Sequence, residues 1–203
     1  MSLVIPFSGA CERNKDVILD VISPYLNKAK TVLEIGSGTA QHAIYFAQNT
    51  PHIVWQTSDQ IEYLEGINAQ LQNTNIDNVQ RPYELDVNQT QWIENQQRFD
   101  LIYTANTFHI MSWSDVCAFF NGLNSAVNKN AVLIVYGPFK YSGNFTSASN
   151  QVFDQTLRSR ECGSAIRNFE AVDELAKEQG FELIKDHPMP ANNQCLIWKR
   201  EAK

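Results

Sequence analysis

The sequence predicts an α/β fold in which helices alternate with the strands of a mostly parallel sheet. Short runs rich in β-branched residues alternate with longer segments whose apolar residues recur at helical spacing, and this alternation is typical of a parallel sheet covered by helices. The last two runs are joined by a short link without a helix. A short link indicates antiparallel strands, because a parallel crossover needs about a dozen residues or more.

Each element follows from its local pattern. The first helix has apolar residues at helical spacing and nears its end at Pro24, and the last helix ends at Gly180. The run 131–136 is continuously apolar, as expected for a strand buried on both faces. Pro82 is awkward inside a central strand. The predicted strands cover residues 31–35, 53–58, 79–85, 99–105, 131–136, 181–186 and 194–199, and the predicted helices cover residues 16–26, 40–48, 61–73, 113–127, 149–160 and 169–179.

Together these elements predict a Rossmann-like sheet of seven strands, mostly parallel, with an antiparallel C-terminal hairpin and helices on both faces. The link at residues 188–193 is expected to contain no helix. A chain of 203 residues suits one domain, residues 1–203, because no repeat or composition shift marks a second one. Residues 140–168 are long for a plain connection, and such segments are often functional covers.

Composition narrows the class of protein. The formal net charge is -6 and no run of Lys or Arg stands out, which argues against a nucleic-acid partner. The N-terminus lacks the features of a secretory signal, and no stretch approaches the ~20 apolar residues of a membrane helix. We therefore expect a soluble, cytoplasmic protein with no membrane partner. The four cysteines form no C-x-x-C pair, so no metal site is expected.

The first predicted strand runs into the motif Glu34-Ile35-Gly36-Ser37-Gly38-Thr39-Ala40. Its glycines allow a sharp turn and a close approach to a ligand, and the following helix directs N–H groups into the crevice. A nicotinamide dinucleotide fingerprint would place a third glycine at Gln41, so that ligand fits imperfectly. An acidic residue two places before the first glycine suits a ligand with an ammonium group. The alternative is a turn with a purely structural role.

Two aspartates follow at the ends of the next two predicted strands. Asp59 comes about twenty residues after the glycines, where a carboxylate can hydrogen-bond ribose hydroxyls. Asp86 and Val87 follow the third strand, where they would flank an adenine ring. Taken alone, either aspartate is equally well explained as a helix cap or turn residue. Three such features at the carboxyl ends of consecutive strands favour a ligand, because ligands bind at that edge of open parallel sheets.

This order of motifs resembles the class I S-adenosylmethionine-dependent methyltransferases, and more narrowly the DUF938 or methyltransferase-like 26 family. One departure is Ala40, where many relatives of this loop have glycine. The closer resemblance spans nearly the whole chain and is carried by the blocks at residues 8–14, 34–42, 55–59, 105–110, 136–139 and 189–193.

The resemblance implies S-adenosylmethionine as the cofactor and places its parts. Gly36, Ser37 and Gly38 would adjoin its amino-acid portion, Asp59 its ribose, and Asp86 with Val87 its adenine. Glu34 would act indirectly, by accepting from loop amides or from a water near the cofactor ammonium. The resemblance implies no particular methyl acceptor.

Asn106 and His109 follow the fourth strand, at the sheet edge expected to hold the cofactor. Methyl transfer depends chiefly on alignment, and it needs a general base only when the acceptor enters protonated. We hypothesise that Asn106 contacts the cofactor and orients the acceptor, and that His109 is the base or a polar contact. The alternative is that His109 only packs with Phe108 and Ile110.

Other residues have acceptor-side or lid roles under the same hypothesis. Tyr136 and Phe139 would line the acceptor pocket, with core packing as the alternative. Arg13 and Asn14, within a 1–28 segment, would fold over the crevice as a lid, with helix-start chemistry as the alternative. Residues 140–168 would cover the acceptor site.

The leading function is thus methyl transfer from S-adenosylmethionine to a small-molecule acceptor. The alternatives are a non-catalytic binding or scaffold protein and a nicotinamide-dependent oxidoreductase. The sequence leaves open the acceptor, the atom methylated, the use of a base and the oligomeric state.

Overall fold

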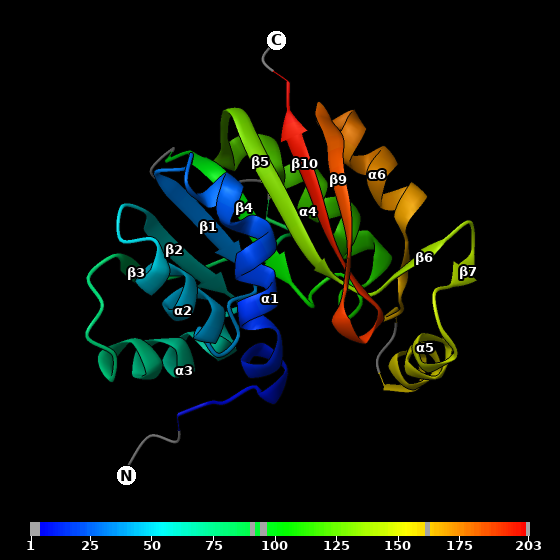
Figure 1. Cartoon of the computed structure of the whole chain (residues 1–203), viewed down its shortest axis with the longest axis horizontal. Helices are drawn as coiled ribbons and strands as arrows, with labels where there is room; N and C mark the ends of the chain where they lie inside the picture. The colour runs from blue at the N-terminus through cyan, green and yellow to red at the C-terminus, as the bar shows by residue number, and fades with distance from the viewer. Residues whose placement is uncertain (1–4, 90–91, 94–96, 161–162, 202–203) are drawn as a thin grey trace. The chain divides into compact units, whose positions relative to one another are not determined.

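The computed structural model describes residues 5–89, 92–93, 97–160 and 163–201 (Figure 1). Its main sheet has seven strands in the order β3-β2-β1-β4-β5-β10-β9, with parallel pairing in the first part and an antiparallel C-terminal pair. This confirms the predicted α/β, Rossmann-like class. The strands of this sheet are β1 (Thr31–Ile35), β2 (Val54–Asp59), β3 (Val79–Glu84), β4 (Phe99–Ala105), β5 (Val127–Gly137), β9 (Phe181–Met189) and β10 (Asn193–Arg200).

The chain divides into two compact units. Unit 1 comprises Met1–Asp86 and Phe99–Thr104, and unit 2 comprises Val87–Arg98 and Ala105–Lys203. The prediction of a single domain over residues 1–203 stays a prediction. Among the described residues, no helix is long and apolar enough to cross a membrane.

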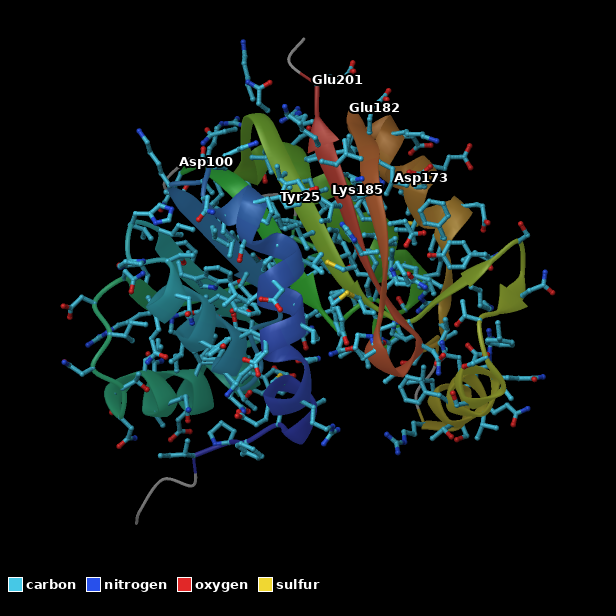
Figure 2. The ribbon with its side chains drawn as sticks, viewed as in Figure 1. Tyr25, Asp100, Asp173, Glu182, Lys185 and Glu201 are labelled. Carbon is cyan, nitrogen blue, oxygen red and sulfur yellow. The ribbon has the colours of Figure 1, made fainter. Side chains whose placement is uncertain are left out.

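In unit 1, β1 pairs in parallel with β2 and β4, and β2 pairs in parallel with β3. The helices are α1 (Gly9–Leu26), α2 (Gln41–Asn49) and α3 (Ile61–Gln72), and α2 lies in front of β2 in Figure 1 and contacts it. Phe46, Trp55 and Tyr103 form a fully buried aromatic cluster with ring centroids 5.5–6.0 Å apart. Asp100 at the start of β4 (Figure 2) accepts from the N–H groups of Lys30 and Thr31, so it ties β4 to β1.

The first helix begins earlier than predicted. The apolar pattern predicts a start at residue 16, but α1 starts at Gly9. Ser8 caps it, because the Ser8 hydroxyl accepts from the Cys11 N–H at 3.3 Å. The added residues, 9–15, are mostly polar, so they show no helical spacing of apolar residues that would predict this part of the helix. Arg13 and Asn14 therefore lie within the helix and not in a segment before it.

Pro82 is accommodated because β3 lies at the edge of the sheet. The register between β2 and β3 also shifts between Gln56 and Ser58, next to the proline. The strand predicted at residues 79–85 is thus confirmed as β3, and its proline does not interrupt a central ladder.

In unit 2, β10 pairs in antiparallel fashion with both β5 and β9. The helices are α4 (Trp113–Ala126), α5 (Ala148–Arg160) and α6 (Phe169–Glu178), and α6 lies beside β9 in Figure 1 and contacts it. Asp173 on α6 (Figure 2) accepts from the buried Trp198 indole at 2.9 Å. This bond fixes α6 to β10.

Two predictions in unit 2 need correction, and the helix predicted within residues 140–168 is confirmed with an addition. β5 begins at Val127, directly where α4 ends, so the strand is longer than residues 131–136. The link between β9 and β10 was expected to lack a helix, but Pro190–Asn192 forms a short 3₁₀ turn. The 140–168 segment contains, besides the predicted helix α5, a small sheet of β6 (Phe139–Tyr141), β7 (Asn144–Phe145) and β8 (Arg167–Asn168). Strands of two or three residues are too short to show an alternating pattern.

Candidate functional site

The glycine turn, residues 36–38, follows β1 in unit 1 with the backbone that the sequence predicted. Gly36 and Gly38 both have left-handed φ angles, of 75° and 55°. The N–H groups of Gly36 and Ser37 each donate to the Ser58 carbonyl at 3.0 Å, so the turn is held against the end of β2. A Cβ added at Gly38 would meet no heavy atom within 4 Å, so open space lies beside the turn at this residue.

Ala40 is the residue that caps α2, and it too is left-handed, with a φ of 57°. Its methyl group is fully buried and packs with Ile44 and Ile67. Left-handed backbone is costly for any residue with a Cβ. This strain gives a physical reason why glycine would occur at this position in many relatives, as the resemblance implies.

Glu34 lies beneath the glycine turn with only 2% of its surface exposed. Its carboxyl accepts from the Ser37 hydroxyl at 3.1 Å and from the Trp55 indole at 3.2 Å. These two donors are side chains, and acceptance from loop amides or from a water near the cofactor ammonium stays a prediction. Burial raises the pKa of Glu34 to about 8, against the opposing effect of these two hydrogen bonds. The side chain therefore carries its proton at neutral pH.

Asp59 at the end of β2 bridges the glycine turn and the start of α3. One carboxylate oxygen accepts from the Gly38 N–H at 2.7 Å and the other from the Gln60 N–H at 2.8 Å. Burial raises the pKa of Asp59, and the two backbone donors oppose that shift. The Leu85 N–H donates to the Asp59 carbonyl at 2.9 Å, which brings the end of β3, and with it Asp86, to the same edge. Unit 1 thus gathers the glycine turn, Glu34, Asp59 and Asp86 at the carboxyl ends of its strands.

The start of α1 is fixed to the residues that follow the glycine turn. The Gln41 amide oxygen accepts from the Ser8 N–H at 2.6 Å and from the Thr39 hydroxyl at 2.9 Å. Asn14 contacts the buried ring of His42, with 2.7 Å between its amide oxygen and Nε2. The contacts of Gln41 and His42 join residues about 30 positions apart, so no local pattern predicts them, although both residues lie in the block at residues 34–42 that carries the resemblance.

Two contacts fix the tautomer of His42. Nε2 faces the Asn14 amide oxygen, an acceptor, and Nδ1 lies 3.2 Å from the Tyr103 hydroxyl. Nε2 therefore carries the proton and Nδ1 accepts from Tyr103. Burial lowers the pKa of His42 to about 4, so the ring is neutral and structural.

Arg13 lies on the exposed side of α1, over the helix start. A Cβ at Gly9 would lie 3.1 Å from its Nη1. An exposed arginine here is as consistent with a solvated side chain in the first turns of the helix as with a lid over the crevice, so the lid role stays a prediction.

In unit 2, the His109 loop (residues 106–111) follows β4. Asn106 has a left-handed φ of 61°, and its N–H donates to the Tyr136 carbonyl at 2.8 Å. His109 is 7% exposed, and its ring meets Phe153 edge to face at 5.4 Å. Among the residues the structure describes, neither ring nitrogen of His109 has a hydrogen-bond partner. Burial and the charge of Arg167 lower the pKa of His109 to about 4.

The ring nitrogens of His109 are not among the side-chain atoms of the described residues that are both fully buried and without a partner, so they are accessible. The arrangement leaves His109 able to accept a proton or a hydrogen bond from a ligand. The ring also packs against Phe153, so the packing alternative stays open.

The other predicted residues of unit 2 are buried. Tyr136 and Phe139 are 3% and 1% exposed, which matches core packing, and their place in an acceptor pocket stays a prediction. Val87 is also buried, and its carbonyl accepts from the Trp92 indole at 3.4 Å. Within the described ranges, no group of three or more His, Cys, Asp or Glu side chains is placed to hold a metal ion.

One family model matches this chain, and several solved structures of methyltransferases are similar to it. The model described as "Protein of unknown function (DUF938)" matches residues 5–200. An O-methyltransferase family protein from Burkholderia thailandensis aligns with a TM-score of 0.76 and 12% identity, over 95% of this chain and 60% of that one. Human N-acetylserotonin methyltransferase in complex with S-adenosylmethionine aligns with a TM-score of 0.79 and 12% identity, over 95% of this chain and 53% of that one.

The S-adenosylmethionine-dependent methyltransferase SibL, in its apo form, gives a TM-score of 0.78 and 17% identity, over 94% of this chain and 55% of that one. The chain thus spans between 53% and 60% of the length of these three proteins. At such identities the likeness shows a shared fold.

Proposed function

This chain belongs to the DUF938 family, and we propose that it transfers the methyl group of S-adenosylmethionine to a hydroxyl group of a small molecule. The observation that carries the proposal is the glycine turn with a buried acid beneath it and an aspartate at the end of the next strand, all within unit 1. The fold shared with S-adenosylmethionine-dependent methyltransferases supports it. Membership of the narrower methyltransferase-like 26 group stays a prediction.

The residues of unit 1 fit the chemistry of the cofactor. Gly38 leaves open space without a side chain, and Glu34 offers a carboxyl that gains from a nearby cation. Asp59 keeps carboxylate lone pairs for ribose hydroxyls while it holds the turn, and Asp86 is assigned to the adenine end. When bound, S-adenosylmethionine supplies a methyl group on a sulfonium, a cation that becomes a neutral thioether on transfer.

The nicotinamide alternative loses support from Gln41. In the dinucleotide fingerprint the third glycine permits close packing of helix and strand. Here the side chain at that position is engaged with Ser8 and Thr39.

The residues of unit 2 are assigned to the acceptor. His109, which has no hydrogen-bond partner among the described residues, would accept the proton of the acceptor hydroxyl. Asn106 orients the acceptor and contacts the cofactor, as hypothesised from the sequence. A hydroxyl acceptor is favoured because the similar structures include proteins titled as O-methyltransferases.

The test is release of S-adenosylhomocysteine from S-adenosylmethionine in the presence of fractionated small-molecule extracts. The proposal expects a fraction that supports turnover, and it expects His109→Gln to reduce the rate by at most about 10²-fold, the low end of a general base's contribution, because a pKa of about 4 makes His109 a weak base. Undiminished transfer by His109→Gln would remove the base assignment. S-adenosylmethionine binding with no transfer to any fraction would favour the non-catalytic alternative.

A further inference from the structure

Two backbone carbonyls of the His109 loop accept hydrogen bonds from one side chain in a distant part of unit 2. Arg167, which is 8% exposed, donates from Nε to the Phe108 carbonyl at 2.9 Å. Its Nη2 donates to the Met111 carbonyl and, at 2.7 Å, to the Gly163 carbonyl. The guanidinium thus contacts the residue before His109 and a residue just after it.

This use of arginine is costly. Burial penalises the charged form and lowers the pKa of Arg167. No carboxylate of the described residues lies within ion-pair distance of it, so its hydrogen bonds go to neutral carbonyls. Buried charges are normally paired, and an apolar residue would fill the volume at lower cost. The five donors of the planar guanidinium can, however, hold several carbonyls in one fixed arrangement.

The segment around Arg167 strengthens the same contact. The Ser164 hydroxyl donates to the Ile110 carbonyl at 2.7 Å. Gly163 approaches the other end of the loop so closely that a Cβ would lie 3.0 Å from the Cβ of Ser112. Three carbonyls of the loop, at residues 108, 110 and 111, are therefore bound by residues 164 and 167.

A second link leads from the same segment to the ring that faces His109. The Ile166 N–H donates to the buried Asp154 carboxylate at 2.7 Å, and Asp154 follows Phe153 on α5. Phe153 meets the His109 ring edge to face. The segment thus contacts the loop that carries His109 and also the helix that packs on its ring.

We propose that Arg167 is a positioning residue for His109: by holding the carbonyls of Phe108 and Met111 it fixes the loop and the direction of the imidazole. The inference rests on the proposed function where it treats His109 as the base. The charge of Arg167 also opposes protonation of His109. The charged and titratable groups that act on Arg167 in turn are Arg158, Asp154, Asp115 and Cys117.

The test uses two variants of the full chain. Arg167→Met removes the N–H donors of the guanidinium, and Arg167→Lys keeps the positive charge but lacks the planar guanidinium. Arg160→Met, an exposed arginine near the end of α5, is the matched control. Amide hydrogen exchange is followed at Ile110 and Met111, whose N–H groups both donate to the Thr107 carbonyl within the loop. Amides of Ile134 in β5 and Leu196 in β10 report on the sheet.

We expect exchange at Ile110 and Met111 to accelerate by about tenfold or more in Arg167→Met, because charge-assisted bonds to buried carbonyls are lost, and by less in Arg167→Lys. The sheet amides should not change. In an NMR titration, with the His109 signal assigned through His109→Gln, the pKa of His109 should rise in Arg167→Met and stay low in Arg160→Met.

Loop exchange equal to that of the control in both Arg167 variants would overturn the proposal. Equal acceleration at the loop and the sheet would also overturn it, because that pattern belongs to a residue that only stabilises the fold. Neither readout needs an acceptor or a bound cofactor. A protein that failed to bind S-adenosylmethionine would sink the proposed function and leave this result standing.

Discussion

Glu34 shows how one residue can connect burial to ligand choice. Its carboxyl is protonated in the free protein because burial raises its pKa to about 8, and its hydrogen-bond donors come from Ser37 and Trp55. A cation placed nearby favours the ionised form and lowers that pKa. A ligand with an ammonium group should therefore drive a proton from Glu34 into solution when it binds.

The expected result is a pH-dependent affinity. S-adenosylhomocysteine should bind more tightly as pH rises from about 5.5 to about 7.5, where its α-amino group keeps its proton, with at most about tenfold per pH unit. Calorimetry in buffers of different ionisation enthalpy measures the proton released. Glu34→Gln, which cannot release one, should bind with no such dependence. If wild type and Glu34→Gln share one flat profile, Glu34 does not sense the ammonium.

The backbone strain at Ala40 can be measured by comparing the effect of Ala40→Gly on stability with that of the same substitution at a neighbouring alanine. Ala40→Gly relieves a left-handed backbone worth roughly 1–2 kcal/mol. The substitution also removes a buried methyl group, which lowers the free energy of unfolding by about 0.8 kcal/mol. Glycine gives the unfolded chain more conformational freedom, which lowers it by a further amount of about 0.4–1 kcal/mol. The free energy of unfolding should therefore stay within about 1 kcal/mol of wild type, by chemical denaturation, because these terms offset one another.

The matched control is Ala43→Gly, a fully buried alanine inside the same helix. It loses the same methyl group and gains no relief, so it should lower the free energy of unfolding by about 2 kcal/mol, the sum of the helix-propensity and burial costs. Equal losses in the two variants would show that Ala40 is not strained.

At the scale of elements, the sequence predicted those that are long and periodic. The bounds of β4 and of α3 through α6 agree with prediction to within one residue, because each has a clear apolar period or a stop signal such as Gly180. The polar first turns of α1 and the short strands β6, β7 and β8 were missed. Their positions depend on contacts between distant residues, such as Ser8 with Gln41, which no local period encodes.

The same limit applies to the candidate site. The glycine turn and Asp59 could be predicted because glycines and an acidic residue at strand ends form a local pattern. Arg167 could not, since its partners are carbonyls some 56–59 positions away in the chain. The sequence indicates His109 as a candidate, but that its ring has no hydrogen-bond partner among the described residues is visible only in three dimensions.

The attachment of α1 to α2 makes a prediction at this scale. Gln41→Ala removes the acceptor of the Ser8 N–H and of the Thr39 hydroxyl. Hydrogen exchange should accelerate at the first turns of α1 by up to about tenfold, since one lost, partly buried hydrogen bond costs about 0.5–1.5 kcal/mol, and should stay unchanged at the middle of α1. Gln70→Ala, on α3, is a control, because its amide oxygen has no partner among the described residues. Unchanged exchange in Gln41→Ala would show that other contacts hold the helix start.

At the scale of the whole chain, fold and chemistry are supported by different observations. Similar structures at 12–17% identity show the fold. The residues at the carboxyl ends of β1, β2 and β3 carry the binding proposal, and those of the His109 loop carry the catalytic one. A failure of the second would leave an S-adenosylmethionine-binding protein.

Binding of S-adenosylhomocysteine to the purified chain, followed by calorimetry and thermal shift, tests the central claim most directly. The account predicts saturable binding by wild type and by the exposed-site control Asp77→Asn. It predicts affinity weakened by about tenfold or more in Asp59→Asn, which keeps one acceptor for the Gly38 N–H but loses a charged acceptor for ribose hydroxyls. A normally folded wild type that shows neither heat nor a thermal shift with S-adenosylhomocysteine or S-adenosylmethionine would contradict it.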